Sequence, residues 1–181
     1  MRELTDLPAT FELQGRVERN AVRVVLIDSL GSVLLLSTRD ASNPAFGVSW
    51  ELPGGGIAPK EGVAEAAVRE VHEETGIRIL MSDVGAPLWH REVLYTYRGE
   101  KRLQHEAVCV ARIAGTAPAI DVTGRETVEM EDHLLHRWWR VDEMITSKDR
   151  FYPRRLPHYI DALLAGHKIV DPLESWDEAH S

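Results

Sequence analysis

The chain has 181 residues, of which 44% are hydrophobic and 28% charged, and it carries a formal net charge of −8. At roughly 150 residues per domain this predicts a single domain, residues 1–181, and the ordinary globular composition excludes a disordered or collagen-like chain. An acidic protein does not attract nucleic acid or anionic membranes through its overall field, so we expect neither as a partner. If the substrate carries phosphate, something other than surplus Lys and Arg must neutralise it.

The predicted elements follow from hydrophobic periodicity and turn residues. We expect an N-terminal extension, then strands around one central and one late helix, which together predict a mixed sheet in a layered domain. In chain order these are the extension (1–13), strands (16–27 and 33–36), a loop (38–48), a short extended piece (50–52), a glycine break (53–56), a helix (62–75), strands (77–80, 88–97 and 103–113), a loop (116–132), a strand (136–141) and a C-terminal helix within 154–166.

The single cysteine, Cys109, lies in an apolar run and is interpreted as a buried hydrophobic residue. One cysteine allows no internal disulfide, which fits a reducing, cytoplasmic location. The first residues contain no apolar stretch typical of a secretory signal, and no segment is long and apolar enough to predict a membrane span.

Three glutamates share one face of the predicted central helix. Glu70, Glu73 and Glu74 stand at i, i+3 and i+4, where like charges repel one another. They also lie in the last turn, where the helix dipole disfavours anions. A hard divalent cation such as Mg²⁺ would account for this arrangement, whereas the simpler interpretation is a solvated acidic face. Arg69 can pair with Glu73 or Glu65 and so orient the carboxylates.

The residues around this helix resemble the Nudix box, the signature of the Nudix hydrolase family. The match runs from Gly55 to Ile77 and agrees at every defined position: glycine, five residues, Glu61, seven residues, Arg-Glu-Val, one residue, Glu-Glu, one residue, Gly76 and Ile77. The preceding residues 50–55 (Trp-Glu-Leu-Pro-Gly-Gly) also look like the usual lead-in.

The resemblance implies an α/β fold, an α/β/α sandwich with a mixed central sheet, in which the box (55–77) forms a loop, a helix and a loop. It implies hydrolysis of a nucleoside diphosphate linked to a further group, such as an ADP-ribose-like compound, a nucleotide sugar or a nucleoside triphosphate. Mg²⁺ or Mn²⁺ would be bound by Glu70, Glu73, Glu74 and a backbone carbonyl of Gly54 or Gly55, with Gly54 preferred. Arg69 would orient these glutamates and Glu61 would brace the loop, while Gly76 suits a left-handed helix cap. A homodimer is also common in the resembling family.

The water that attacks the phosphate needs a general base. Box glutamates, Glu73 and Glu70 among them, can serve in the resembling family, as can an acid from a downstream loop. Here that loop offers Glu126, Glu129, Glu131 and Asp132, of which we favour Glu129 or Glu131, although a solvated loop explains the same residues.

Arg39 and Arg91 could contact phosphate, and Trp50 could stack on a base or sugar; a surface charge or core packing are the alternatives. Two other functions remain open: a Nudix-type domain that binds a nucleotide as a sensor without hydrolysing it, and an isomerase on the same fold. The sensor usually lacks box residues that are all present here, and the isomerase would need a catalytic cysteine that Cys109 does not provide.

The acidity is concentrated rather than spread. Residues 61–76 and 121–132 each hold five acidic residues and one arginine, which together account for the whole net charge of −8. The sequence therefore predicts that a phosphate substrate binds only together with a divalent cation.

Overall fold

A computed structural model describes residues 15–39, 47–121, 123, 133–171 and 173–176. The described elements are β1 (Val17–Ile27), β2 (Val33–Arg39), β3 (Val48–Glu51), α2 (Val63–Thr75), the 3₁₀ turn η2 (Met81–Asp83), β4 (Trp89–Tyr97), β5 (Glu100–Arg112), β6 (His133–Trp139), α4 (Val141–Thr146), β7 (Phe151–Tyr152), α5 (Leu156–Leu164), β8 (Ile169–Val170) and β9 (Glu174–Ser175).

The strands form one mixed sheet in the order β7-β3-β2-β1-β5-β4-β8, with β6 also pairing with β2 and β9 with β4. Its longest contact is the parallel ladder between β1 and β5, from Val17 opposite Arg102 to Ile27 opposite Arg112. β4 and β5 form an antiparallel hairpin, and its turn at Arg98 and Gly99 has positive φ at both residues, as a tight hairpin turn requires.

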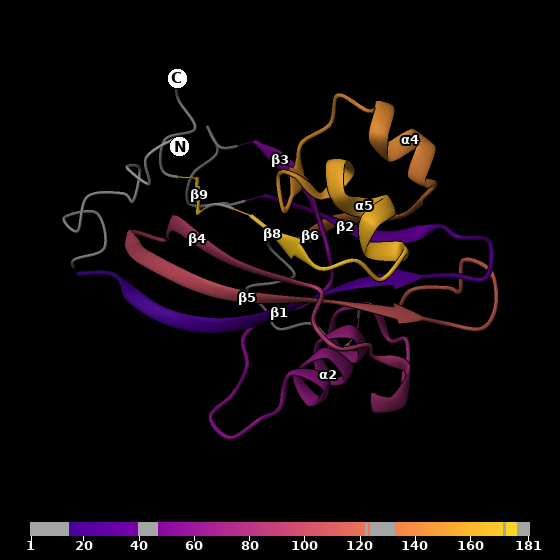
Figure 1. Ribbon diagram of the computed structural model, residues 1–181, viewed down its shortest axis with the longest axis horizontal. Helices are drawn as coiled ribbons and strands as arrows, with labels where there is room; N and C mark the ends of the chain where they lie inside the picture. Colours follow the sequence, from indigo (N-terminus) through magenta and orange to yellow (C-terminus); the bar gives the residue numbers. More distant parts are fainter. Residues whose placement is uncertain (1–14, 40–46, 122, 124–132, 172, 177–181) are drawn as a thin grey trace, which may run out of the picture.

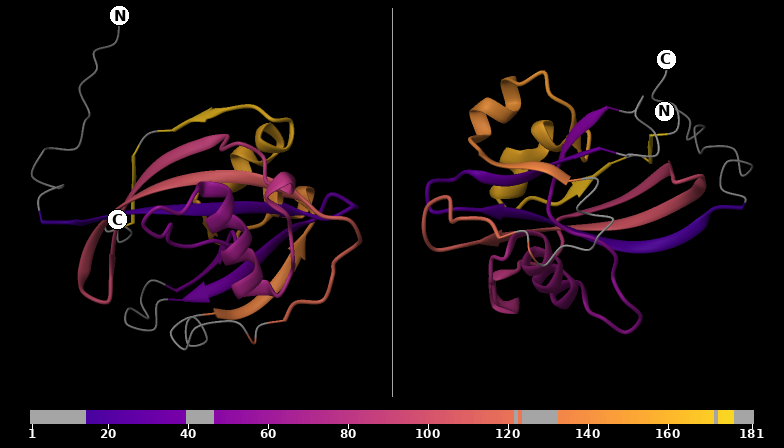
Figure 2. Two further views of the ribbon diagram at one scale, coloured as in Figure 1. Left: turned by 90° about the horizontal axis from the view of Figure 1, so that it is seen from below. Right: turned by 180° about the vertical axis from the view of Figure 1, so that it is seen from behind.

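Helices cover both faces of the curled sheet, α2 on one side and α4 and α5 on the other (Figures 1 and 2). Alternation along β1 explains these two layers, because successive side chains point to opposite faces. Val22, Val24 and Leu26 belong to the core beneath α2, whereas Val25 belongs to the core beneath α5. The predicted α/β/α sandwich with a mixed sheet is confirmed.

The central helix forms as predicted, beginning after Gly62 and ending at Gly76, whose φ of 70° is left-handed. The Gly62 N–H donates to the Glu65 carboxylate over 2.8 Å, so Glu65 caps this helix rather than pairing with Arg69. Cys109 is buried in β5, as expected, and burial raises the pKa of its thiol to about 11.

Several boundaries differ from the predictions. Residues 77–80 form no strand; Ile77 and Ile79 pack against the core beneath α2, which explains their apolar pattern. Strand β6 covers His133–Trp139 rather than the predicted 136–141, and Val141 instead begins the short helix α4. Most of the predicted acidic loop, residues 122 and 124–132, lies outside the described residues.

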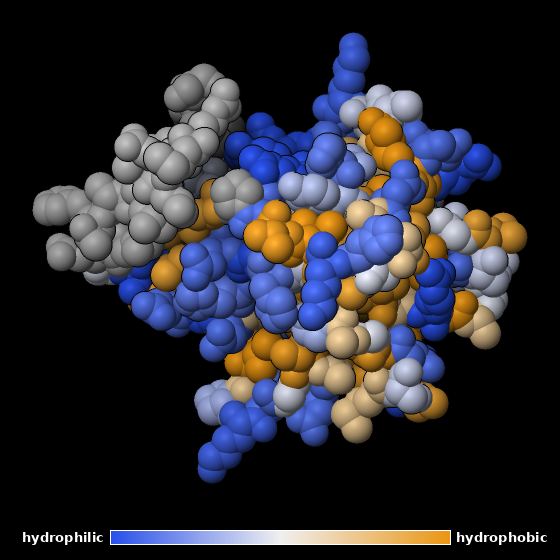
Figure 3. All heavy atoms as spheres, in the orientation of Figure 1, coloured by the Kyte–Doolittle hydropathy of each residue, from blue (hydrophilic) through white to orange (hydrophobic). Residues whose placement is uncertain are grey.

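None of the helices in the described ranges is long and apolar enough to cross a bilayer. On the face seen in Figure 3, hydrophobic residues appear as separate patches among hydrophilic ones. Among the described residues, the most exposed large hydrophobic side chains, Val170 and Leu30, come from different parts of the chain.

Candidate active site

The glycine turn before α2 lies directly on the backbone of β1. The Val22 N–H donates to the Gly55 carbonyl over 2.9 Å, and the Val24 N–H donates to the Pro53 carbonyl over 2.8 Å. Gly54 has a φ of 144°, and a Cβ built on it would lie 2.1 Å from the Val22 carbonyl oxygen. Only glycine therefore fits at this position.

The turn is also bound to the helix that follows it. The Gly54 N–H donates to Glu74 Oε2 over 2.8 Å, and the Glu74 side chain is buried. A Cβ on Gly55 would lie 2.6 Å from the carboxyl carbon of Glu70, which is also buried. Gly55 thus leaves the room that the Glu70 carboxylate occupies, and the Gly54 N–H fixes the Glu74 carboxylate.

Arg69 joins the remaining acids of the box. Its Nε and Nη2 donate to the Glu61 carboxylate over 2.8 and 2.9 Å, a bidentate contact, and its Nη2 also donates to the Gly56 carbonyl over 2.8 Å. Its Nη1 donates to Glu70 over 2.7 Å and to Glu73 over 3.1 Å. One guanidinium therefore offsets the repulsion among the acids of the helix and fixes Glu61 beside them.

The Arg69 hydrogen bond, together with the Ala58 N–H, lowers the pKa of Glu61 from 4.5 to about 2. Glu61 is therefore ionised throughout the physiological range. The same contacts with Glu61 and Glu70 raise the pKa of Arg69, which stays charged.

The chemistry of these donors fits a hard divalent cation, because all three helix glutamates offer carboxylate oxygens at one end of α2. Glu70 and Glu74 are buried, whereas the Glu73 side chain is 45% exposed. Within the ranges that the structure describes, however, no group of three or more His, Cys, Asp or Glu side chains is gathered closely enough to hold a metal ion. The carboxylates would have to turn towards a shared ion.

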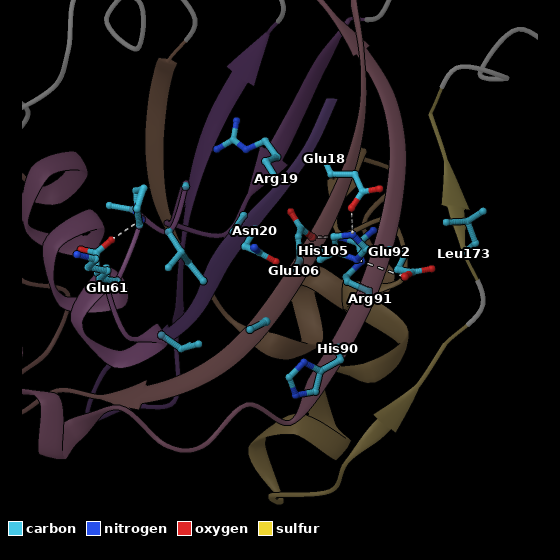
Figure 4. A pocket seen from close by; sticks show the side chains of 18 of the residues that line it. Glu18, Arg19, Asn20, Glu61, His90, Arg91, Glu92, His105, Glu106 and Leu173 are labelled. Carbon is cyan, nitrogen blue, oxygen red and sulfur yellow. Dashed lines mark hydrogen bonds and ion pairs between the residues drawn. The ribbon is translucent and has the colours of Figure 1, made fainter. Parts of the chain in front are cut away.

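A cleft of about 1010 Å³ opens beside the turn (Figure 4). Its walls are the start of β1, the loop before α2, the facing parts of β4 and β5, and residues near β9. Gly56 and Glu61 line this cleft and also contact Arg69, so the cleft adjoins the acidic helix.

Arg19 enters the cleft from β1, on the side that faces the loop of Glu61 (Figure 4). Within the described part of the chain its guanidinium has no hydrogen-bond or ion-pair partner, and it lies 2.9 Å from where a Gly56 Cβ would be. The sequence reasoning did not single out Arg19; its position between polar neighbours at the edge of a strand gave no signal.

Of the three residues predicted to contact the substrate, one lines the cleft and two do not. Arg91 lines the cleft, but its side chain is only 1% exposed and forms ion pairs with Glu106 and Glu174, each over 2.7 Å. Arg39 lies exposed at the end of β2, and Trp50 packs edge-to-face on Trp139 at 5.3 Å; neither lines the cleft.

The predicted bases Glu129 and Glu131 lie outside the described residues, together with Glu126 and Asp132. Gly76 takes the predicted left-handed cap, and its N–H donates to the His72 carbonyl.

Glu106 is the buried centre of a charge network that the sequence reasoning missed. Its side chain is fully buried, and burial acts to raise its pKa, but Arg91 and Arg23 outweigh burial and hold the pKa low. Arg23 interrupts the apolar run of residues 21–27, which was the available signal, whereas Glu106 follows the polar residues of β5 and gave none.

Comparison with known proteins agrees with this geometry. The family model described as NUDIX domain matches residues 17–161. An RNA pyrophosphohydrolase of Erythrobacter litoralis is 30% identical over 135 residues, which cover 70% of this chain and 78% of that protein. An RNA pyrophosphohydrolase of Teredinibacter turnerae is 25% identical over 84% of this chain and 93% of that protein.

The fold is also that of a MutT protein from Methanosarcina mazei, whose crystal structure aligns with a TM-score of 0.58 at 19% identity, over 83% of this chain and 96% of that one. The chain therefore belongs to the NUDIX family of hydrolases, whose box lies on α2 and the glycine turn.

Alanine at the two neighbouring glycines is expected to have unequal effects on stability. Gly54→Ala forces a Cβ against the β1 backbone at positive φ and should cost about 3 kcal/mol or more. Gly55→Ala meets only the movable carboxylate of Glu70 and should cost clearly less. Urea unfolding followed by circular dichroism measures both, and equal losses would contradict the close packing of Gly54 on Val22.

Replacing Glu61 with Gln should remove a stabilisation that depends on pH. Because the folded pKa of about 2 lies below the ordinary 4.5, the contribution of Glu61 is complete above pH 4.5 and is lost as the pH falls through about 2. The difference in unfolding free energy between wild type and Glu61→Gln should therefore shrink as urea titrations move from about pH 5 to about pH 2.5. A difference that stays constant over this range would contradict the Arg69 contact.

Proposed function

We propose that this protein hydrolyses the pyrophosphate bond of a nucleoside diphosphate linked to a further group, and that the reaction depends on Mg²⁺ or Mn²⁺. The observation that carries the proposal is the acidic end of α2, where Arg69 binds Glu61, Glu70 and Glu73 beside the glycine turn. Membership of the NUDIX hydrolases supports it.

Glu70, Glu73 and Glu74 would hold the cation. Among the turn carbonyls, that of Gly55 accepts the Val22 N–H and that of Gly56 accepts from Arg69. Among the described residues, the donor found at the Gly54 carbonyl is Arg23, over a long 3.4 Å, so this is the turn carbonyl best able to add a ligand. When bound, the cation supplies neutralisation of phosphate charge and alignment of the pyrophosphate for attack by water.

The remaining roles fall to the protein's own groups. Arg69 keeps the helix glutamates oriented, and the half-exposed Glu73 is free enough of packing to accept a proton from water. Glu129 and Glu131 remain proposals for the same role. Arg19 supplies a cation to the cleft, where it is placed to receive a substrate phosphate.

RNA with a 5′-triphosphate is a second candidate substrate and is included in the experiment below. Both relatives described above are named RNA pyrophosphohydrolase, so a 5′-triphosphorylated RNA is a further compound whose end carries the same phosphate anhydride. The acidic net charge of this chain favours a small nucleotide over long nucleic acid.

The deciding experiment is a substrate panel with and without Mg²⁺ or Mn²⁺. It contains ADP-ribose, nucleotide sugars, nucleoside triphosphates and a 5′-triphosphorylated RNA oligonucleotide, with released phosphate or pyrophosphate as the readout. We expect metal-dependent turnover of at least one small nucleotide. Binding without turnover across the panel would favour the sensor, and turnover of RNA alone would overturn the exclusion of nucleic acid.

Substitution of Glu73 tests the acidic helix directly. Glu73→Gln removes a charge from the proposed cation site and should lower kcat/KM by about 100-fold. Glu143→Gln, which changes an exposed acid on α4 across the sheet, is the matched control and should stay within about twofold of wild type. Wild-type turnover in Glu73→Gln would exclude Glu73 from the reaction.

Substitution of Arg19 tests the proposed phosphate contact. Arg19→Met replaces the arginine stem with an unbranched apolar side chain and removes the charge, and should raise KM about tenfold with a smaller change in kcat. Arg140→Met, at an exposed arginine that pairs with Asp142, is the control. An unchanged KM for Arg19→Met would show that the substrate does not reach this part of the cleft.

A further inference from the structure

Arg23 contacts the glycine turn from strand β1, on which the turn packs, although it lies outside the Nudix box. From β1 its Nη1 donates to the carbonyls of Leu52, over 3.2 Å, and Gly54, over 3.4 Å. The same nitrogen lies 3.5 Å from Glu51 Oε2, and the side chain is only 14% exposed. One guanidinium thus contacts both ends of the short segment that precedes Gly55.

Glu106 fixes this guanidinium on the side away from the turn. Its Oε1 accepts from Arg23 Nε over 3.2 Å and from the Tyr152 hydroxyl over 2.9 Å. Gln104 Nε2 donates to the same oxygen over 2.5 Å, while the other oxygen accepts from Arg91 over 2.7 Å. With its carboxylate held by four donors and fully buried, Glu106 is a rigid anchor.

The segment that Arg23 contacts is the one that orients Glu74. The Gly54 N–H donates to Glu74 Oε2 over 2.8 Å, while the Gly54 carbonyl faces Arg23. A rotation of this segment would move both the donor to Glu74 and the carbonyl proposed as a ligand. The contacts run from Glu106 through Arg23 and Gly54 to Glu74.

We propose that Arg23, anchored by Glu106, is a positioning residue for the cation site: it fixes the Leu52–Gly54 backbone and thereby orients Glu74. This inference rests on the proposed function. It assigns a role in the reaction to one residue of β1 and one of β5, both outside the Nudix box.

A positioning role and a purely electrostatic role of Arg23 predict opposite changes in cation affinity when Arg23 is replaced. A guanidinium near a cation site opposes cation binding through its charge, so a purely electrostatic role predicts tighter binding when Arg23 is removed. A positioning role predicts weaker binding. The variant Arg23→Lys distinguishes the two roles further. Lysine keeps the charge, but it lacks the planar guanidinium that binds Glu106 and two carbonyls together.

The experiment compares Arg23→Lys and Arg23→Met with wild type by two readouts. Amide exchange of Gly54, followed by NMR in the metal-free protein, should accelerate about tenfold in both variants because the turn loosens. Mn²⁺ affinity, measured by electron paramagnetic resonance without substrate, should fall about tenfold in both. Turnover at saturating Mg²⁺ should recover only partly, since Glu74 stays misplaced.

Leu163→Ala in α5, a buried change beneath the other face of the sheet, is the control for lost stability. It should lower the melting temperature while leaving Gly54 exchange and Mn²⁺ affinity unchanged under native conditions. If the Arg23 variants fold poorly, Glu106→Gln, which keeps the shape of the anchor, should show the same changes in smaller degree.

The inference is overturned if Arg23→Lys matches wild type in both readouts, if Arg23→Met binds Mn²⁺ as tightly or more tightly, or if only one readout changes. Failure of wild type to bind Mn²⁺ would instead count against the proposed function. Gly54 exchange in the variants would still decide whether Arg23 positions the turn.

Discussion

The close approach of the glycine turn to β1 is the constraint on which the site depends. Gly54 lies so near the Val22 carbonyl that a side chain cannot be accommodated, and two backbone hydrogen bonds from Val22 and Val24 hold the turn there. Because β1 is paired with β5 along its whole length, this contact transfers the rigidity of the sheet to the turn. The helix that follows then starts from a fixed point.

Charge is arranged around this contact in two linked groups. On the helix side, Arg69 gathers Glu61, Glu70 and Glu73, which would otherwise repel one another. On the sheet side, Arg23 and Arg91 surround Glu106. In the sheet-side group, removing one partner leaves a buried charge uncompensated, so that group is more costly to break than its net contribution to stability suggests.

Sequence reasoning located the features that depend on neighbours along the chain. The helix was predicted to within one residue because its apolar spacing, its glutamates and Gly76 all lie within a few residues of one another. The strand over 77–80 was predicted wrongly, since Ile77 and Ile79 are apolar for contact with α2 rather than for pairing. The two-residue strands β8 and β9 gave no periodic signal and exist only through pairing with β4.

The parts of the site that could not be predicted depend on pairs distant in sequence. Arg23 and Glu106 are 83 residues apart and meet because β1 and β5 are parallel neighbours, a pairing that periodicity does not specify. Trp50 illustrates the same limit: an aromatic residue next to the box can equally face a ligand or the core, and here it packs on Trp139.

The cleft and the acidic helix share residues, which bears on how an acidic protein can bind phosphate. Gly56 and Glu61 line the cleft on one side and contact Arg69 on the other. A substrate that entered beside Arg19 would therefore meet a cation on β1 and the Glu61 carboxylate in the loop, behind which Arg69 connects to the carboxylates of α2. Arg19 can attract one phosphate group without a bound cation, but the carboxylates would repel the second phosphate group of the same substrate. A divalent ion held at the helix, as proposed, would reverse the sign of that second contact, so both halves of a pyrophosphate would then face positive charge although the chain as a whole is acidic.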